Sequence, residues 1–352
     1  MRLMSWKRFF CLAVGIVFGV ALASASAIVY TCDPTIDAAV AGTCLTLNST
    51  IAGIYSSTFS NANAKIYITY GTTGLAQSLQ YYTNVTYTAY ANALTLDETD
   101  ANDVTAVNSL GGTTTNPVAS GDGVALTSAL ATTLNLAVAA GSSGITSTNA
   151  QCTLGTAGCY NGVVTLTNAA NTFYYRSGGQ PAGTYDFYTA VEHETDEVLG
   201  TSSCITGSGN NPATIATSVN CTNHLPANPA VGVSAPDLFR YASSGTRSYL
   251  ATANASLAYF SINGGTTNIA SYNNQPNGAD YGDWNSASDR VQNAFGTPGT
   301  NGFNITNDGG SEIAVLDAIG YTLTSSVPEP GTGVLLAAAL AVLAGLARRR
   351  AV

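Results

Sequence analysis

Residues 191–200, with the sequence VEHETDEVLG, constrain the fold of this chain most strongly, because they concentrate titratable side chains on one predicted helix. An apolar run precedes the segment, and Gly200 at its end is a typical helix stop. His193 and Glu197 are four residues apart, so they share one face of a helix and lie one turn from each other. Glu194 follows His193 directly. The fold must therefore either solvate this acidic helix or build a site around it.

The spacing of these residues is typical of a zinc-hydrolase helix, which carries two metal ligands at i and i+4 and a glutamate beside the first. His193 and Glu197 are the predicted ligands, since a carboxylate oxygen can replace the usual second imidazole. Glu194 is the predicted general base that takes a proton from water. The alternative is that the acids of this helix are merely exposed: Glu192, Glu194, Asp196 and Glu197.

The sequence leaves the third metal ligand open between two residues. His224 is the only other histidine, and a Cys204–Cys221 loop would tether it near the helix. Asp237, just before an apolar pair, is the other choice. We favour His224, because a site with three anionic ligands and no second imidazole would favour calcium or manganese over zinc.

Charge also limits the partners of the chain. Without its two ends, the chain has five Lys and Arg against nineteen Asp and Glu, a net charge of −14. Such a surface repels nucleic acids, so no nucleic-acid partner is expected, and it suits divalent cations. Asp280, Asp283 and Asp289 lie in one turn-rich segment and predict a separate Ca²⁺ site. Turn formation explains the same three residues equally well.

Both ends of the chain are predicted to be targeting segments. Residues 1–27 combine a basic start, a short apolar run and the tripeptide ASA, which indicates a signal peptide removed by signal peptidase. Residues 28–326 are then one domain. Residues 327–352 contain PEP, a mostly apolar run and three arginines; the run is just long enough for a short transmembrane helix.

This tail resembles the PEP-CTERM sorting signal of Gram-negative bacteria. The resemblance implies export through the inner membrane, processing by an exosortase, and release or attachment at the cell surface. An ordinary tail anchor is the alternative.

Six cysteines remain after removal of the signal peptide, and an even number in an exported chain predicts disulfides. Because each close pair encloses a short polar loop, we expect neighbours to pair. Zinc ligation by these cysteines would need a CxxC-like spacing, which the sequence lacks. The expected pairs are Cys32–Cys44, Cys152–Cys159 and Cys204–Cys221.

Hydrophobic periodicity predicts one continuous α+β domain, with a mixed sheet packed against helices. Helices are expected over residues 47–55, 87–94, 101–110, 124–136 and 312–319. Strands are expected over residues 65–70, 163–167, 172–176, 237–241, 257–262 and 269–272.

Residues 185–200, YDFYTAVEHETDEVLG, resemble the zinc-binding segment of secreted metzincin-like metalloproteases, and in particular the bacterial group that carries PEP-CTERM tails. The likeness extends to STFSNANAKIYITYG, APDLFRYASSGTRSY and LDAIGY. It implies a metzincin-like architecture, bound Zn²⁺ and a protein or peptide substrate. His193 matches the first ligand, Glu194 the catalytic glutamate and Glu197 the second-ligand position.

The chain departs from this family at two points. Ser203 stands where the third histidine would fall, and Met1 and Met4, the only methionines, leave with the signal peptide, so no methionine turn is expected. The expected function is an exported zinc-dependent endopeptidase. A catalytically degenerate, protease-like envelope or extracellular-matrix protein is the alternative. A carbohydrate-binding or adhesive module is a third reading, motivated only by the many Tyr and Asn residues.

Overall fold

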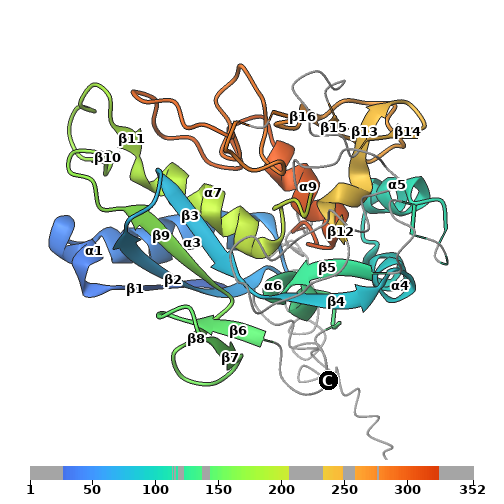
Figure 1. The fold of residues 1–352 in the computed structure, drawn as a ribbon, viewed down its shortest axis with the longest axis horizontal. Helices are drawn as coiled ribbons and strands as arrows, with labels where there is room; N and C mark the ends of the chain where they lie inside the picture. Colours follow the sequence, from blue (N-terminus) through green and yellow to red (C-terminus); the bar gives the residue numbers. More distant parts are fainter. Residues whose placement is uncertain are drawn as a thin grey trace, which may run out of the picture.

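The computed structural model describes most of the chain between its two ends. The described residues are 27–112, 114, 116–117, 123–136, 143–205, 233–248, 258–275 and 277–324. Within these ranges mixed sheets pack against helices (Figure 1), which confirms the expected α+β class.

A four-stranded sheet forms the centre of the molecule, with the order β1-β2-β9-β3. Its strands are β1 (Ala27–Cys32), β2 (Asn63–Gly71), β9 (Gly162–Thr167) and β3 (Ala76–Gln80). The first three run parallel, and β3 pairs antiparallel with β9 at the edge. The strands expected over residues 65–70 and 163–167 are therefore confirmed.

Helices cover one face of this sheet, and a small three-stranded sheet lies on the other (Figure 1). The helical layer contains α1 (Pro34–Ala39), α2 (Thr43–Thr46), the π-helical η1 (Leu47–Ile51), α3 (Ala52–Thr58) and α7 (Phe187–Leu199). The small sheet contains β6 (Ser143–Thr146), β7 (Gln151–Thr153) and β8 (Cys159–Tyr160). Helix α7 contacts β3, β9 and β2, so one side of it is fixed by the central sheet.

The rest of the described chain packs beside this core. One group comprises β4 (Tyr82–Thr86), β5 (Gly123–Thr127), β12 (Val233–Ser234), α4 (Tyr87–Asp97), α5 (Ala101–Ser109), α6 (Ser128–Thr133) and α9 (Ser311–Ile319). A second group comprises β10 (Phe173–Tyr174), β11 (Tyr185–Asp186), the 3-10 helix η3 (Pro236–Phe239), β13 (Arg240–Ser243), β14 (Thr246–Arg247), β15 (Tyr259–Phe260) and β16 (Ala270–Ser271). Helix α9 contacts both α7 and α5.

Two predicted elements are wrong in part. The helix expected over residues 124–136 begins as strand β5, because this segment pairs with β4, and α6 starts only where the Thr127 side chain accepts from the Leu130 N–H at 3.3 Å. The strand expected over residues 237–241 starts as a 3-10 helix, with Pro236 at its first position. Short apolar runs of this kind do not distinguish strand from helix.

Two of the three expected disulfides are confirmed, Cys32–Cys44 and Cys152–Cys159. Cys204 is disulfide-bonded too, and its partner lies outside the described residues. Residues 1–26 of the expected signal peptide, His224, the PEP segment and the apolar run after it also lie outside them. Among the helices that are described, none is long and apolar enough to cross a membrane.

Helix α7 lies so close to β9 that only glycine fits at one position. A Cβ on Gly162 would overlap with the side chain of Val198. We expect G162A to lower the free energy of unfolding by about 1–3 kcal/mol, as overpacking of a core does. Urea unfolding measures this change. G53A is the matched control, because no atom lies within 4 Å of its added Cβ and alanine favours the helix. Equal stability of G162A and wild type would contradict the close packing.

Candidate metal centre

Helix α7 begins and ends where its capping residues require. The Asp186 carboxylate accepts from the backbone N–H groups of Tyr188 and Thr189, at 3.0 and 3.3 Å, and so acts as the N-cap. Gly200 ends the helix with φ 128°, a conformation that favours glycine. The end at Gly200 matches the sequence expectation for this helix.

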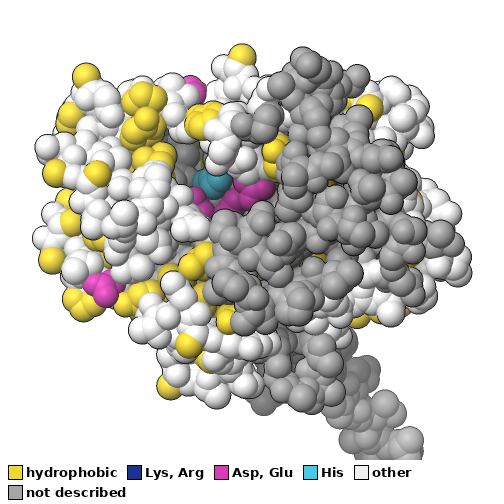
Figure 2. Space-filling model, viewed as in Figure 1, with side chains coloured by type: hydrophobic (Ala, Val, Ile, Leu, Met, Phe, Trp, Pro, Cys, Tyr) yellow, Lys and Arg dark blue, Asp and Glu magenta, His cyan; other side chains and the backbone are white. Residues whose placement is uncertain are grey.

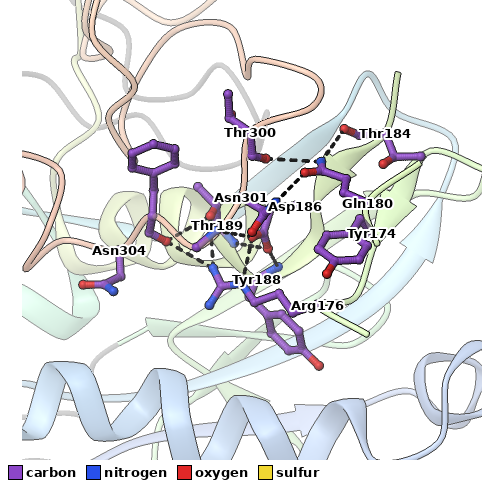
Figure 3. A network of polar contacts seen from close by, with 12 residues as sticks. Tyr174, Arg176, Gln180, Thr184, Asp186, Tyr188, Thr189, Thr300, Asn301 and Asn304 are labelled. Carbon is purple, nitrogen blue, oxygen red and sulfur yellow. Dashed lines mark hydrogen bonds and ion pairs between the residues drawn. The ribbon is translucent and has the colours of Figure 1, made fainter. Parts of the chain in front are cut away.

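A polar network ties the start of α7 to a distant loop (Figure 3). Arg176 Nε lies 2.7 Å from Asp186 Oδ2, and Arg176 Nη2 donates to the Thr189 hydroxyl and the Phe303 carbonyl. Gln180 Nε2 donates to the carbonyl oxygens of Thr184 and Thr300. The network holds residues 297–304 against α7, where several of them line a cavity.

His193 presents one ring nitrogen for a ligand. Its Nδ1 lies 2.9 Å from the carbonyl oxygen of Val291, which can only accept, so Nδ1 carries the proton. In the neutral ring, Nε2 then has a lone pair for a ligand. It lies 3.6 Å from Asp283 Oδ1 and 3.9 Å from Glu197 Oε1, and the three ligand atoms all fall within 4.8 Å of one another. Such an imidazole, oriented by a backbone carbonyl, is typical of metal-binding histidines.

Neighbouring side chains fix both carboxylates. Ser78 on β3 donates to Glu197 Oε2 at 2.5 Å, and Gln292 Nε2 donates to Asp283 Oδ1 at 3.0 Å. Helix α9 supports this side of the site, because Glu312 Oε1 accepts from the Gln292 N–H and from Trp284 Nε1. The segment that carries Val291 and Gln292 is thus held in place.

Several acidic side chains lie close together in the site. Glu194 is 5% exposed, and its Oε2 has no hydrogen-bond partner in the described part of the chain. Burial, followed by the charges of Glu197, Asp283 and Asp280, raises the pKa of Glu194 well above its ordinary value. Burial and the same acidic neighbours also raise the pKa values of Asp280 and Asp283. Buried carboxylates in such a group need protons or a cation.

The site opens into a cavity of about 700 Å³. Figure 2 shows a histidine beside acidic side chains in a hollow on this face. The lining includes residues 73–78 at the edge strand β3, the acidic turn around Asp280 and the segment that contains Phe295. The ligand atoms therefore lie at the wall of a space large enough for several residues of a peptide.

The structure brings together only some of the residues that the sequence selected. His193, Glu194 and Glu197 all line the cavity, and Asp283 joins them, so this aspartate belongs to the His193 site and not to a separate calcium site. Asp237 is elsewhere: its carboxylate accepts from Ser203 Oγ, the Cys204 N–H, and the Ser234 N–H and hydroxyl. These four donors make it a structural cap.

The alternative of an exposed acidic helix is wrong. The four acids Glu192, Glu194, Asp196 and Glu197 are 0, 5, 0 and 7% exposed. Asp196 Oδ1 accepts from the Tyr55 hydroxyl at 2.6 Å, and Glu192 Oε2 accepts from the Ile305 N–H. The helix is therefore buried on both its site face and its rear face.

Gly282 determines how closely the acidic turn approaches α7. A Cβ at this position would lie 2.7 Å from the Ser203 nitrogen and 2.9 Å from the Thr201 oxygen, both of them backbone atoms. We expect G282A to displace Asp283 and weaken metal binding by about 10–100-fold, the usual effect of disturbing the support of a ligand. Calorimetric titration with zinc measures this. G179A, with open space around its Cβ and, like G282A, no left-handed backbone, is the control; equal affinities of wild type and G282A would contradict the prediction.

Comparison with known proteins identifies the C-terminal tail. Residues 326–351 match the family model of the PEP-CTERM protein-sorting motif, as the sequence predicted. The motif implies that the protein is exported, sorted to the cell surface and processed by an exosortase. No curated protein and no solved structure matches the chain.

Proposed function

We propose that this exported protein is a metal-dependent peptidase, in which His193, Glu197 and Asp283 bind a divalent cation and Glu194 is the general base. One observation carries the proposal: an imidazole nitrogen and two carboxylate oxygens converge within 4.8 Å on the wall of a large cavity. Beside them is the buried Glu194, whose Oε2 has no hydrogen-bond partner among the residues that the structure places.

The donor set is suitable for such a cation. Zn²⁺ accepts imidazole nitrogen and carboxylate oxygen, and a catalytic site needs three protein ligands with one position open. Two carboxylates beside one imidazole also suit Mn²⁺ and, less well, Ca²⁺. We expect Zn²⁺, because the Val291 carbonyl holds the His193 ring with Nε2 facing the site, as in transition-metal sites.

When bound, the ion would polarise a substrate carbonyl and make water more acidic. Glu194 would take a proton on a carboxylate oxygen and pass it to the leaving amine. The Val291 carbonyl keeps the imidazole oriented, and Ser78 holds Glu197 against it. The second carboxylate ligand places more negative charge on the site than a second histidine would, so we expect modest turnover.

The shape of the cavity supports a peptide as the substrate. Strand β3 lies at the edge of the described sheet, and its residues line the cavity next to Glu197. An extended peptide can add to such an edge through main-chain hydrogen bonds, independent of its sequence. The strongly acidic chain would favour neutral or basic peptides over acidic ones.

Metal removal tests the proposal directly. The purified protein, dialysed against EDTA, should cleave casein no faster than buffer, and one equivalent of Zn²⁺ should restore cleavage. Elemental analysis of the reloaded protein should give one zinc per chain. Absence of bound metal at micromolar zinc would overturn the metal site.

A single contact favours the catalytically degenerate alternative. Gln292 Nε2 lies 3.0 Å from Asp283 Oδ1 and 3.4 Å from His193 Nε2, so its amide bridges these side chains. If the Gln292 amide still bridges Asp283 and His193 when zinc is present, the site keeps its shape but catalyses no cleavage. Stoichiometric zinc without cleavage of casein or of a peptide library would support this second function, a structural role at the cell surface.

A further inference from the structure

A second group of carboxylates lies between α5 and α9, apart from the residues of the His193 site. Asp100 and Asp103 stand at the start of α5, and Asp317 stands on α9. One oxygen from each of these three side chains lies within 4.8 Å of the others. Asp97, at the end of α4, lines the same small space as Asp103 and Asp317.

Helix capping explains two of these residues and leaves the third unexplained. Asp100 Oδ1 accepts from the N–H groups of Asn102 and Asp103, and Asp103 Oδ2 accepts from Thr99 and the Asp100 N–H, which completes a capping box. Asp317 is 3% exposed, and its Oδ1 lacks a hydrogen-bond partner among the residues that the structure describes. Burying a carboxylate oxygen in this way is costly unless something binds it.

The charges around Asp317 make its burial more unfavourable. Burial first, and then Asp103, Asp100 and Asp97, raise the pKa of Asp317 to about 8. All three of these neighbours are acidic, and a hydrogen bond from the Asn102 side chain offsets their effect only in part. Asp97, Asp103 and Asp317 line a space of about 10 Å³, close to the volume of one water-sized sphere, so it suits a single small ion.

We propose that Asp100, Asp103 and Asp317 bind one calcium ion that fastens α5 to α9. The site offers only carboxylate oxygens, and hard cations prefer such donors, whereas zinc prefers sites with imidazole or thiolate. An exported protein meets calcium outside the cell, where binding modules operate with dissociation constants of about 10⁻⁴–10⁻³ M. The site is independent of the proposed peptidase activity.

Binding here would stabilise the part of the fold that supports the first site. Helix α9 carries Glu312, whose Oε1 holds Trp284 and Gln292. Fastening this helix to α5 would resist its separation from the rest of the domain. The expected effect is thermal stabilisation that increases with calcium concentration.

The test uses the full exported chain with the H193A substitution, which disables the first site. Thermal unfolding is followed in EDTA and in about 10 mM calcium or magnesium. Calcium should raise the Tm of this parent by roughly 3–8 °C. Adding D317N should reduce the calcium shift to under about 1 °C, with no loss of Tm in EDTA, because asparagine removes the charge buried among the other acids.

Matched variants separate binding from a general effect of charge. D37N removes one exposed carboxylate far along the chain from the cluster, and it should keep the full calcium shift. D100N, which preserves a capping side chain, should reduce the shift even if D317N fails to fold. The proposal is overturned if calcium leaves the Tm of the parent unchanged, if D317N and D100N retain the shift, or if magnesium produces an equal shift.

Discussion

The E194Q variant should bind zinc as wild type does and cleave casein about 10²–10⁴-fold more slowly. Glutamine keeps the size and the hydrogen-bonding capacity of the side chain but cannot take a proton, and general-base catalysis contributes an effect of this magnitude. Glu194 is buried at the cavity wall, beside the ligand atoms, and its Oε2 oxygen is unpartnered within the described structure. Initial rates at saturating casein, measured on zinc-reloaded protein, give the comparison.

The control for E194Q is E98Q, which makes the same chemical change at a residue outside the cavity lining. It should retain the wild-type rate. Zinc content is measured on the same samples, so that loss of chemistry is separated from loss of metal. If E194Q keeps more than about a tenth of the wild-type activity, Glu194 is not the general base. That result would not contradict the proposed metal site.

Replacement of Asp283 by asparagine should weaken zinc binding by at least about 10²-fold. Changing only the support of a ligand costs about 10–100-fold in affinity, and Asp283 offers its own oxygen. D283N is nearly the same size as the native side chain and keeps one oxygen, so the fold should survive. Titration of the metal-free protein with zinc, read by calorimetry, gives the affinity, and the Tm of each variant reports folding.

D289N is the matched control, because Asp289 lies in the same acidic segment and lines the same cavity but is not among the three converging ligands. It should bind zinc with wild-type affinity. The sequence favoured His224 as the third ligand, so H224A is measured in parallel. If H224A loses zinc and D283N keeps it, the third ligand is His224 and not Asp283.

The sequence predicted the local part of this site well, because its signals are local. Spacing alone put His193 and Glu197 on one helical face, and Gly200 ends that helix as expected. The pairing of Cys32 with Cys44 followed from proximity along the chain. Such features depend on a few neighbouring residues, so periodicity and capping rules suffice to find them.

The third ligand could not be found in this way, because it depends on packing between segments far apart in the chain. Asp283 reaches His193 only because Gly282 lets its turn approach the backbone after α7. The sequence indicated Asp283 only as a member of an acidic segment, together with Asp280 and Asp289. Burial of Glu192 and Asp196 was also unexpected, since unpaired acids usually face solvent.

The π-helical turn over Leu47–Ile51 has a consequence for the rear of α7. A turn with one extra residue rotates everything that follows it around the helix axis, and Tyr55 follows it directly in α3. The phenol of that tyrosine donates a hydrogen bond to Oδ1 of Asp196, a buried acid on α7. Deleting one residue from this turn would restore ordinary helical winding and rotate the Tyr55 phenol about 100° away. The buried Asp196 carboxylate would then lose the hydrogen bond from Tyr55. The π-helical turn, although it lies outside the cavity, thus positions the hydroxyl that supports the buried rear face of α7.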